Sequence, residues 1–542
     1  MKRSLGMPMA VAAFAVITGG WLLQQGVDRA ENVYVRVRVL QEVVDRVESS
    51  FVEDVGSDAL YTSAIDGLIR DLGDPHSSFL PAQDYENLRI RGVDGEYGGV
   101  GLEVVERNGL VTVVSPIPST PGARAGIRAG DQFWEINGIP ADTMDTDQAV
   151  DLLRGRPGTE VSVKMRRPGV EEPIPFSVER ATIRLLAVPF AMMLDDKVGY
   201  VPLQSVRETS TTEIRAAVDS LQAEGMESLV FDLRGNPGGL LDQGIAISDL
   251  FLDSGLDIVE TRGRAAGQSE TYGAENEDRY PELSIAVLVD GGSASASEIV
   301  AGALQDHDRA IVVGETSYGK GSVQSLFRLT GGDVLRLTTA KWYTPVGRSI
   351  DRDPESEVAD VPAHAMSISG QFVFPTTLEG RPEYESTGGR TLYGGGGITP
   401  DLFVAPETLS PQEIAAVQRV FQHAGGFTVA LFNFAVEYVP EHPDLQVGFS
   451  VSEADLADLF ESLSEHEAVI ERADFETARR FVRYHLEREI ALQAWGEAEQ
   501  FQQSIPFDRQ LQRALDLLRD GPGTEELLEA VSAAENEAGS TP

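Results

Sequence analysis

Apolar runs in the middle of the chain alternate with segments of helical spacing. Residues 228–233 and 284–290 are almost wholly apolar and end at glycine-rich turns, which is typical of strands buried on both faces. Helical stretches follow at 240–251 and 299–305, and a further apolar run follows at 309–314. The order strand, helix, strand predicts a βαβ unit with parallel strands that end at the same edge of a sheet. Ligands of open α/β sheets bind at that edge.

Residues suited to nucleophilic chemistry follow the last two of these strands. Ser295 lies in the small-residue turn Gly291-Gly-Ser-Ala-Ser-Ala-Ser-Glu298, and Lys320 lies between two glycines after the next strand. Because both strands end at the same edge, the lysine is expected to lie close to the serine, as a Ser–Lys nucleophile pair requires. Gln324 follows closely enough to orient the amine. A lysine acts as a base only when neutral, and partial burial away from carboxylates favours the neutral form.

An oxyanion hole is expected beside the serine. The turn Arg234-Gly-Asn-Pro-Gly-Gly239 follows the first strand and precedes a helical stretch. Bare glycine N–H groups at a helix start are suited to holding a negative oxygen. The N–H of Ala296, together with that of either Gly238 or Gly239, would hold the oxyanion of an acyl-transfer intermediate.

The nearby polar residues allow other interpretations. A triad with His307 is excluded, because a helix from the serine to this point is about 18 Å long at about 1.5 Å per residue; a position at the helix end is expected instead. Ser317-Tyr-Gly-Lys320 matches a β-lactamase motif but lacks its companion motifs. Asp232 and Arg234 are interpreted as a buried ion pair, and Glu298 as an acidic residue at a helix N-terminus. Without the lysine and the glycines, the serine turn would indicate only a helix cap.

A second module precedes these strands. Strand-like runs at 111–114, 133–138 and 160–166 and a helical stretch at 147–153 follow the glycine-rich segment Tyr97-Gly-Gly-Val-Gly-Leu-Glu-Val104. This order of elements resembles a PDZ domain of the bacterial protease type.

The PDZ resemblance implies capture of a protein C-terminus by β-strand addition. Gly98, Gly99, Val100 and Gly101 would form the carboxylate-binding loop, and Leu102 would start the receiving strand. The alternative is that these glycines only turn a hairpin. Capture of a tail raises the effective concentration of a substrate at the active site. Substrates are therefore expected to be proteins or peptides with accessible, apolar C-termini.

The motifs of the serine, the lysine and the glycine turn together resemble the C-terminal processing (tail-specific) serine proteases. Asp74-Pro-His-Ser-Ser-Phe-Leu80 and Tyr343-Thr-Pro-Val-Gly-Arg-Ser-Ile350 extend the resemblance, which covers residues 30–404 in the family's order. It implies an α/β, crotonase/Clp-peptidase-like core in which Ser295 is the nucleophile, Lys320 the general base and Gln324 its support. It implies no cofactor and no metal.

Five regions are expected along the chain. They are a signal anchor or signal peptide at 1–27, an N-terminal helical region at 28–94, a PDZ domain at 95–181, a serine protease core at 182–404 with an insertion at 351–396, and an acidic helical C-terminal domain at 405–542. The insertion departs from the family pattern and is interpreted as a surface loop, a lid or a subunit contact. In the last region, Ser410-Pro-Gln-Glu413 predicts a capping box. This domain would serve homo-oligomerisation, a rim around the active site, or neither.

The N-terminus predicts export. Lys2 and Arg3 precede the largely apolar stretch 5–23, which lacks a clear cleavage site and is near the lower limit of a membrane span. An uncleaved anchor is favoured over a removed signal peptide. The bulk of the chain would then be periplasmic or otherwise extracytoplasmic, held at the inner membrane.

The amino-acid composition excludes several classes of protein function. The 542 residues contain no cysteine, which excludes disulfides and thiol catalysis. A formal charge of −42 argues against nucleic-acid binding. Seven scattered histidines show no metal-ligand spacing. The sequence therefore predicts a serine endopeptidase that processes or degrades exported proteins. The alternative is a catalytically silent PDZ scaffold, against which the intact set of serine, lysine and glutamine argues.

Overall fold

The computed structural model forms two compact units, Met1–Gln83 with Gln324–Thr338, and Asp84–Val323 with Thr339–Pro542. It describes residues 34–90, 95–107, 109–167, 170, 172–352, 365–374, 378–421, 424–463, 470–519 and 523–538. The predicted signal segment lies outside these ranges. Within them, no helix combines the length and apolar character needed to cross a bilayer.

The first unit is built from helices and a small antiparallel sheet. Residues 34–50 are helical and are followed by α2 (Ser57–Arg70) and the short strand β1 (Ser78–Leu80). β1 pairs antiparallel with the start of β18 (Val334–Tyr343), which also pairs with β17 (Ser322–Arg328). The helical character expected for the N-terminal region is therefore present.

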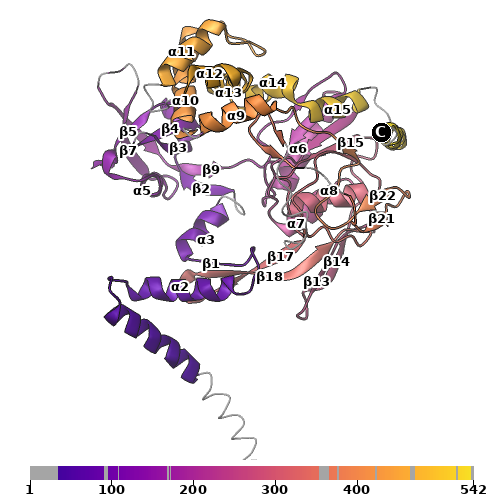
Figure 1. Ribbon diagram of the computed structural model, residues 1–542, viewed down its shortest axis with the longest axis horizontal. Helices are drawn as coiled ribbons and strands as arrows, with labels where there is room; N and C mark the ends of the chain where they lie inside the picture. Colours follow the sequence, from indigo (N-terminus) through magenta and orange to yellow (C-terminus); the bar gives the residue numbers. More distant parts are fainter. Residues whose placement is uncertain are drawn as a thin grey trace, which may run out of the picture. The chain divides into compact units, whose positions relative to one another are not determined.

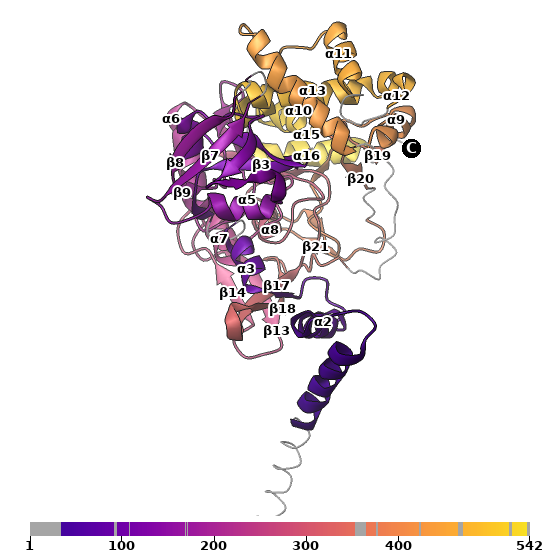
Figure 2. The same cartoon turned by 90° about the vertical axis from the view of Figure 1, so that its left-hand side faces the viewer.

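The PDZ region is a sheet with two short helices. Its strand order is β3 (Leu102–Arg107), β4 (Leu110–Pro116), β5 (Gln132–Ile136), β7 (Glu160–Arg166) and β8 (Ile174–Glu179), with α4 (Pro121–Ala125) and α5 (Thr146–Leu153) (Figure 2). Val161, Val163 and Met165 of β7 alternate with exposed residues and point into the core. β3 is an edge strand. The flanking strands β2 (Glu96–Gly99) and β9 (Ala181–Arg184) pair with each other.

A six-stranded sheet forms the centre of the second unit. Its order is β10 (Met192–Met193), β11 (Val198–Pro202), β12 (Ser228–Asp232), β15 (Ser284–Val289), β16 (Ile311–Gly314) and β23 (Leu402–Phe403). All neighbours pair in parallel except β10 with β11. The predicted βαβ unit is confirmed as β15, α8 (Ala296–Asp306) and β16.

Helices cover both faces of this sheet. On one face, α6 (Ser210–Ala223), α7 (Leu241–Ser248) and α8 pack against residues such as Phe231 and Val287 (Figure 1). On the other face, α15 (Arg509–Leu518) and α16 (Thr524–Ala538) pack against Val230 and Leu288. Successive strand residues thus alternate between two cores, which is why the strands are continuously apolar in sequence. The last two helices therefore cover one face of the core sheet, although they lie in the segment 405–542 that was expected to form an acidic helical C-terminal domain.

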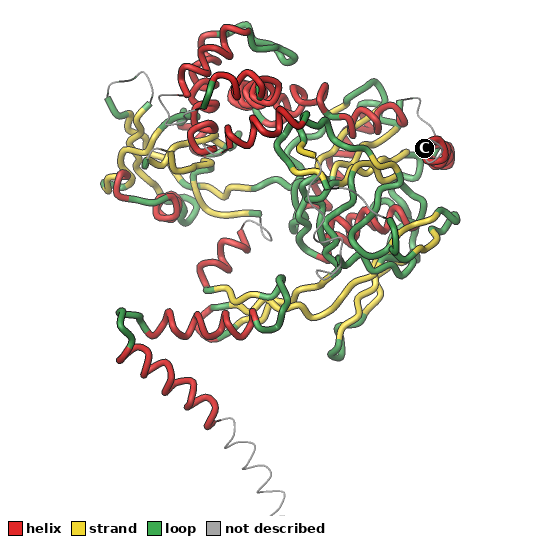
Figure 3. Tube along the Cα trace, viewed as in Figure 1, coloured by secondary structure: helices red, strands yellow, loops and turns green. Residues whose placement is uncertain are grey.

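The preceding C-terminal helices form a core of their own. They are α9 (Pro411–Phe421), α10 (Ala424–Glu441), α11 (Glu453–Leu463), α12 (Arg472–Thr477) and α13 (Arg479–Ala494), the red cluster of helices in Figure 3. The next helix, α14 (Glu497–Ser504), places Phe501 against the second face of the core sheet. The predicted capping box is present, since the N–H of Ser410 donates to Glu413 Oε2 at 2.7 Å and the N–H of Glu413 donates to Ser410 Oγ at 3.3 Å.

The insertion contributes structure to both neighbours. The hairpin β19 (Ala365–Met366) and β20 (Phe372–Val373) places Met366 and Ile368 in the core of the helical cluster. A second hairpin, β21 (Glu383–Glu385) and β22 (Thr391–Tyr393), continues from it. The described parts of the insertion are thus folded and partly buried, which differs from a plain surface loop.

Candidate active site

Ser295 lies in a strained turn between β15 and α8. Its backbone has φ 54° and ψ −117°, a left-handed conformation that non-glycine residues rarely adopt and that costs on the order of 1–3 kcal/mol. The neighbouring glycine turn holds it in place: Ser293 Oγ donates to the carbonyl of Leu233 at 2.8 Å, and the N–H of Ala294 donates to the carbonyl of Asn236 at 2.9 Å. A sharp strand-to-helix turn of this kind exposes a nucleophile at the sheet edge.

One carboxylate joins the backbone of Ser295 to that of Lys320. Glu298 Oε2 accepts the N–H of Ser295 at 2.7 Å and the N–H of Lys320 at 2.9 Å. The distance between these two backbone nitrogens therefore cannot exceed the sum of the two hydrogen-bond lengths. Ser317 is completely buried and its hydroxyl donates to Glu298 Oε1, so it is no accessible nucleophile.

The two candidate glycines of the oxyanion hole differ in what their N–H groups do. The N–H of Gly238 donates to the buried Asn236 Oδ1 at 2.8 Å. Gly239 is exposed, and its N–H has no protein acceptor in the described part of the chain. The N–H of Ala296 stands at the first position of α8. Gly238 nevertheless touches the serine turn, because a Cβ at this position would lie 2.8 Å from Ser295 Cβ.

Gln324 belongs to the first unit. It lies on β17, and its Nε2 donates to Thr338 Oγ1 at 3.5 Å. Thr338 also connects to the Asp74 motif, since its N–H donates to Ser77 Oγ at 3.0 Å and Ser77 Oγ donates to Asp74 Oδ2 at 2.5 Å. These contacts connect two segments that the sequence analysis had linked only by resemblance.

The predicted carboxylate-binding loop is divided between a strand and a turn. Gly98 and Gly99 lie in β2, opposite Thr182 and Ala181 of β9. Val100 is buried, and its carbonyl accepts the N–H of Gly122 at 2.7 Å. Gly101 has φ 73° and turns the chain into β3, which Leu102 begins. The turn itself is thus shorter than the four residues expected, and it leads directly into the edge strand.

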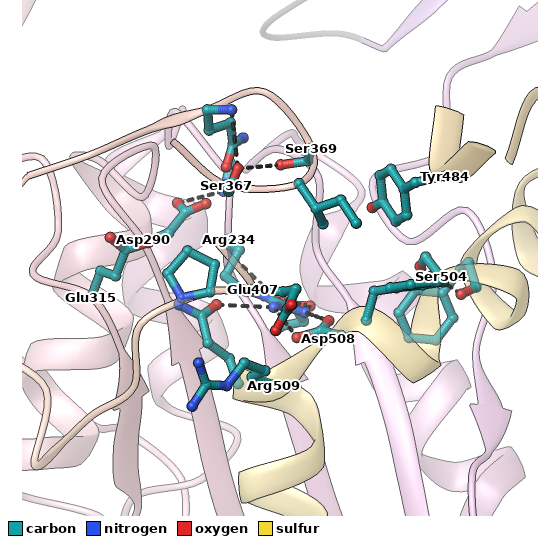
Figure 4. A pocket seen from close by; sticks show the side chains of 18 of the residues that line it. Arg234, Asp290, Glu315, Ser367, Ser369, Glu407, Tyr484, Ser504, Asp508 and Arg509 are labelled. Carbon is teal, nitrogen blue, oxygen red and sulfur yellow. Dashed lines mark hydrogen bonds and ion pairs between the residues drawn. The ribbon is translucent and has the colours of Figure 1, made fainter. Parts of the chain in front are cut away.

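The expected ion pair of Asp232 and Arg234 is present and has a third member. Arg234 Nη2 donates to Asp232 Oδ2 at 2.6 Å. It also donates to Asp508 Oδ2 at 2.7 Å (Figure 4). Asp508 also caps α15, because its side chain accepts the N–H of Leu511. The cluster therefore anchors the glycine turn to the helix layer behind the sheet, a connection that no local sequence signal reveals.

These residues line a polar cavity of about 300 Å³ between the sheet edge and the C-terminal helices. Glu315 and Asp290 also line it (Figure 4). Burial raises the pKa of Glu315 to about 7, and the nearby Asp290 carboxylate adds to this shift. Asp290 Oδ1 accepts the N–H groups of Gly235 at 2.8 Å and Gly292 at 2.9 Å. A titrating carboxyl thus lies beside Asp290, the side chain that binds the glycine turn and the serine turn.

His307 occupies the C-terminal end of α8, as expected. It is the C-cap residue, and its Nε2 lies 2.7 Å from the carbonyl oxygen of Asp257. The whole of α8 therefore separates it from the serine turn. Among the described residues, no group of three or more histidine, aspartate or glutamate side chains is arranged to hold a metal ion.

Comparison with known proteins identifies the family. The family description "Peptidase family S41" matches residues 197–358, and a PDZ domain description matches residues 112–167. A carboxy-terminal-processing protease of Bartonella bacilliformis is 41% identical over 59% of this chain and 74% of its own length. The carboxy-terminal processing protease CtpA of Bacillus subtilis is 35% identical over 58% of this chain and 66% of its own length.

Solved structures give partial overlaps. A photosystem II D1 C-terminal processing protease is 27% identical, covers 58% of this chain and 89% of its own, and has a TM-score of 0.34. The PDZ domain of a carboxy-terminal protease from Vibrio cholerae is 18% identical, covers 17% of this chain and 99% of its own, and has a TM-score of 0.16. The assignment rests on the sequence relatives: the chain belongs to the carboxy-terminal processing proteases of peptidase family S41, a family of serine-type peptidases, and carries a PDZ domain.

Proposed function

We propose that this protein is an exported endopeptidase that captures C-terminal tails with its PDZ domain and cleaves peptide bonds with a Ser295–Lys320 dyad. The observation that supports the dyad most directly is the Glu298 carboxylate, which accepts the backbone N–H groups of both residues on one oxygen. The strained backbone of Ser295 supports the same role, because strain of this kind persists where the surroundings over-determine it.

Acylation begins with proton transfer from Ser295 Oγ to the neutral Lys320 Nζ. The serine oxygen forms a bond to the scissile carbonyl carbon, and the carbonyl oxygen takes the negative charge. As the C–N bond breaks, the lysine returns the proton to the leaving amine. Water then attacks the acyl-enzyme by the same route, with Lys320 taking its proton and returning it to the serine. Gln324 has the role of supporting the amine.

The oxyanion is assigned to the N–H groups of Ala296 and Gly239. Gly238 is the weaker choice, because its N–H already donates to Asn236. The N–H of Ala296 heads a helix, so the helix dipole adds to the stabilisation of negative charge. Gly238 keeps a different function in this proposal: the absence of a side chain lets the glycine turn approach the serine turn.

Tail capture is assigned to the edge strand β3 of the PDZ domain. Strand addition requires an unpaired edge, and β3 ends the order of its sheet. The carboxylate of the tail would meet the turn at Val100 and Gly101, and Leu102 would begin pairing. The protein is proposed to act outside the cytoplasm, because residues 1–27 resemble a signal segment. The same segment would serve as the membrane anchor.

The test uses full-length protein in detergent and an unfolded reporter protein with an apolar C-terminal tail. Wild-type protein should cleave the reporter, whereas Ser295→Ala and Lys320→Ala should not, and Ser254→Ala, which alters an exposed serine, should match wild type. Turnover by Ser295→Ala would disprove the proposed nucleophile. A reporter whose tail ends in a carboxamide should show a raised KM with little change in kcat, because the terminal charge is lost.

A catalytically silent PDZ scaffold predicts a different result. It would bind the tail without cleavage in every variant, and the carboxamide would weaken binding equally in all of them.

A further inference from the structure

Glu298 is a buried carboxylate whose partners are all uncharged. Its side chain is fully buried at the start of α8. Besides the N–H groups of Ser295 and Lys320 on Oε2, Oε1 accepts the Ser317 hydroxyl at 2.5 Å and the N–H of Gly319 at 2.7 Å. A carboxylate offers about four lone-pair directions, and four donors occupy them here. Burial raises the pKa of Glu298, and each of these four hydrogen bonds acts to lower it.

A helix cap explains only one of these four bonds. A capping glutamate at the third helical position reaches back to the N–H of the cap residue, which is Ser295. The other three donors come from the segment between β16 and β17, which lies 19 to 22 residues further along the chain. Glu298 therefore joins two separate segments, one that carries the nucleophile and one that carries the base.

Further contacts fix the lysine segment on both sides of Glu298. The N–H of Tyr318 donates to the carbonyl of Ser293 at 2.9 Å. The hydroxyl of Ser317 accepts the N–H of Ile398 at 2.6 Å, and the N–H of Ser317 donates to the carbonyl of Ile398 at 3.0 Å. Ser317 thus connects Glu298, through hydrogen bonds, to Ile398 in the turn that follows the insertion.

We propose that Glu298 is a positioning residue for catalysis, which holds the backbone of Ser295 and that of Lys320 at a fixed separation. The proposal rests on the proposed function, because it assigns a role relative to the dyad. Charge-assisted hydrogen bonds are about twice as strong as neutral ones, and a buried carboxylate aligns its donors in a low dielectric. A displacement of about 1 Å between reacting groups can lower the rate about 100-fold.

Glu298→Gln tests this role with almost no change in size. A glutamine has one acceptor oxygen and one NH₂ group, which donates. The NH₂ group must therefore lie opposite N–H or O–H groups that donated to the carboxylate oxygen in its place. If the NH₂ group faces Ser317, the hydroxyl can accept from it, but the N–H of Gly319 loses its acceptor. If it faces the other side, the N–H groups of Ser295 and Lys320 both lose theirs. In either orientation the lysine segment loses part of its attachment.

The experiment measures kcat, KM and the thermal midpoint of the full-length protein with the reporter of the preceding section. Glu298→Gln is expected to lower kcat at least tenfold and to leave KM within about twofold, because the PDZ domain, which binds the tail, is unaltered. The matched control is Glu413→Gln, which changes the same kind of capping glutamate in α9. It should leave kcat at the wild-type value, even if its thermal midpoint falls.

Two results would overturn the positioning role. One is a folded Glu298→Gln variant with a kcat above half of the wild-type value. The other is an equal loss of kcat in Glu413→Gln, which would show that a weakened helix start anywhere in the chain suffices. A wild-type protein that cleaves nothing would instead refute the proposed function, so the two failures are distinguishable.

Ser317→Ala serves if Glu298→Gln does not fold. It removes one donor to Glu298 and leaves the N–H groups of Ser295 and Lys320 bound to it. The expected result is a kcat lowered about threefold with KM unchanged. An unchanged kcat in this folded variant would overturn the proposal.

Discussion

A methyl group at Gly238 would enter the space that the serine turn occupies. A Cβ there would lie 2.5 Å from the carbonyl oxygen of Ala294, 2.8 Å from the nitrogen of Ala296 and 2.8 Å from Ser295 Cβ. All three atoms belong to the segment that presents the proposed nucleophile and one N–H of the proposed oxyanion hole. Gly238→Ala therefore pushes directly on the turn that carries Ser295.

The size of the effect follows from these distances. Ordinary van der Waals contacts of a Cβ begin at about 3.4 Å, so the turn must move by somewhat less than 1 Å to admit the methyl group. A shift of about 1 Å in a reacting group costs about 100-fold in rate. Gly238 has φ 85°, which adds roughly 1–2 kcal/mol of backbone strain for alanine. Gly238→Ala is thus expected to lower kcat/KM by about 100-fold, with a moderate fall in stability.

Gly235→Ala is the matched control, because it shares the loop and the strain without the clash. Gly235 has φ 65°, and a Cβ at this position would have no atom within 4 Å. Gly235→Ala should therefore lose only the stability that the backbone strain costs, and Gly238→Ala should lose somewhat more. Gly235→Ala should keep kcat/KM within about threefold of wild type. Equal losses of activity in the two variants would refute the steric argument, and so would full activity in a folded Gly238→Ala protein.

Two further predictions concern buried charges. Arg348→Ala should destabilise the core by about 3–5 kcal/mol in urea unfolding, because it leaves the fully buried Asp306 without its ion-pair partner. Arg262→Ala, which removes an exposed arginine, should change the free energy of unfolding little. Equal effects of the two substitutions would contradict this prediction. Glu315→Gln should flatten the pH dependence of the thermal midpoint: burial raises the pKa of Glu315 from 4.5 to about 7, so its stabilising contribution is present below about pH 4.5 and is lost as the pH rises through 7. The variant should therefore gain stability relative to wild type at pH 8, and parallel pH profiles of the two proteins would show that another group titrates.

The sheet of the core could be predicted because its signals are local. Residues 228–233 and 284–290 are almost wholly apolar, and the structure buries every residue of β12 and β15. The parallel direction followed from the helix between β15 and β16, since a short crossover of this kind has essentially one solution. The PDZ domain was recognisable for the same reason, through the alternation in β7.

Features that depend on contacts between distant segments could not be predicted. Nothing in the letters around Ser295 signals its left-handed backbone, which the packing of the glycine turn imposes. The C-terminal helix α15 has the periodicity of any amphipathic helix, so its place on the core sheet was hidden. Asp508 shows the difficulty well, because its partner Arg234 is 274 residues away in the chain.

Glu298 was underestimated for a related reason. An acidic residue three positions after a serine is an adequate helix cap, and the sequence offers no reason to seek more. The additional donors come from backbone N–H groups, which every residue carries and which no motif can therefore mark. A signal did exist in the sequence of the helix, since residues 296–304 of α8 are apolar or small apart from Glu298 and leave this glutamate no polar face that would be open to water.

Carboxylates that bind backbone N–H groups recur in the core of the second unit. The half-buried Asp290 holds Gly235 and Gly292 beside the serine turn. At the other end of α8, the buried Asp401 accepts the N–H of Val312 at 2.7 Å while Arg390 pairs with it. The acidic residues of the chain therefore have two physical roles. The larger share gives a self-repelling surface. A small buried share acts as acceptors that fasten one loop to the next, and these few carboxylates, together with the glycines that allow close approach, give a site assembled from distant segments its fixed geometry.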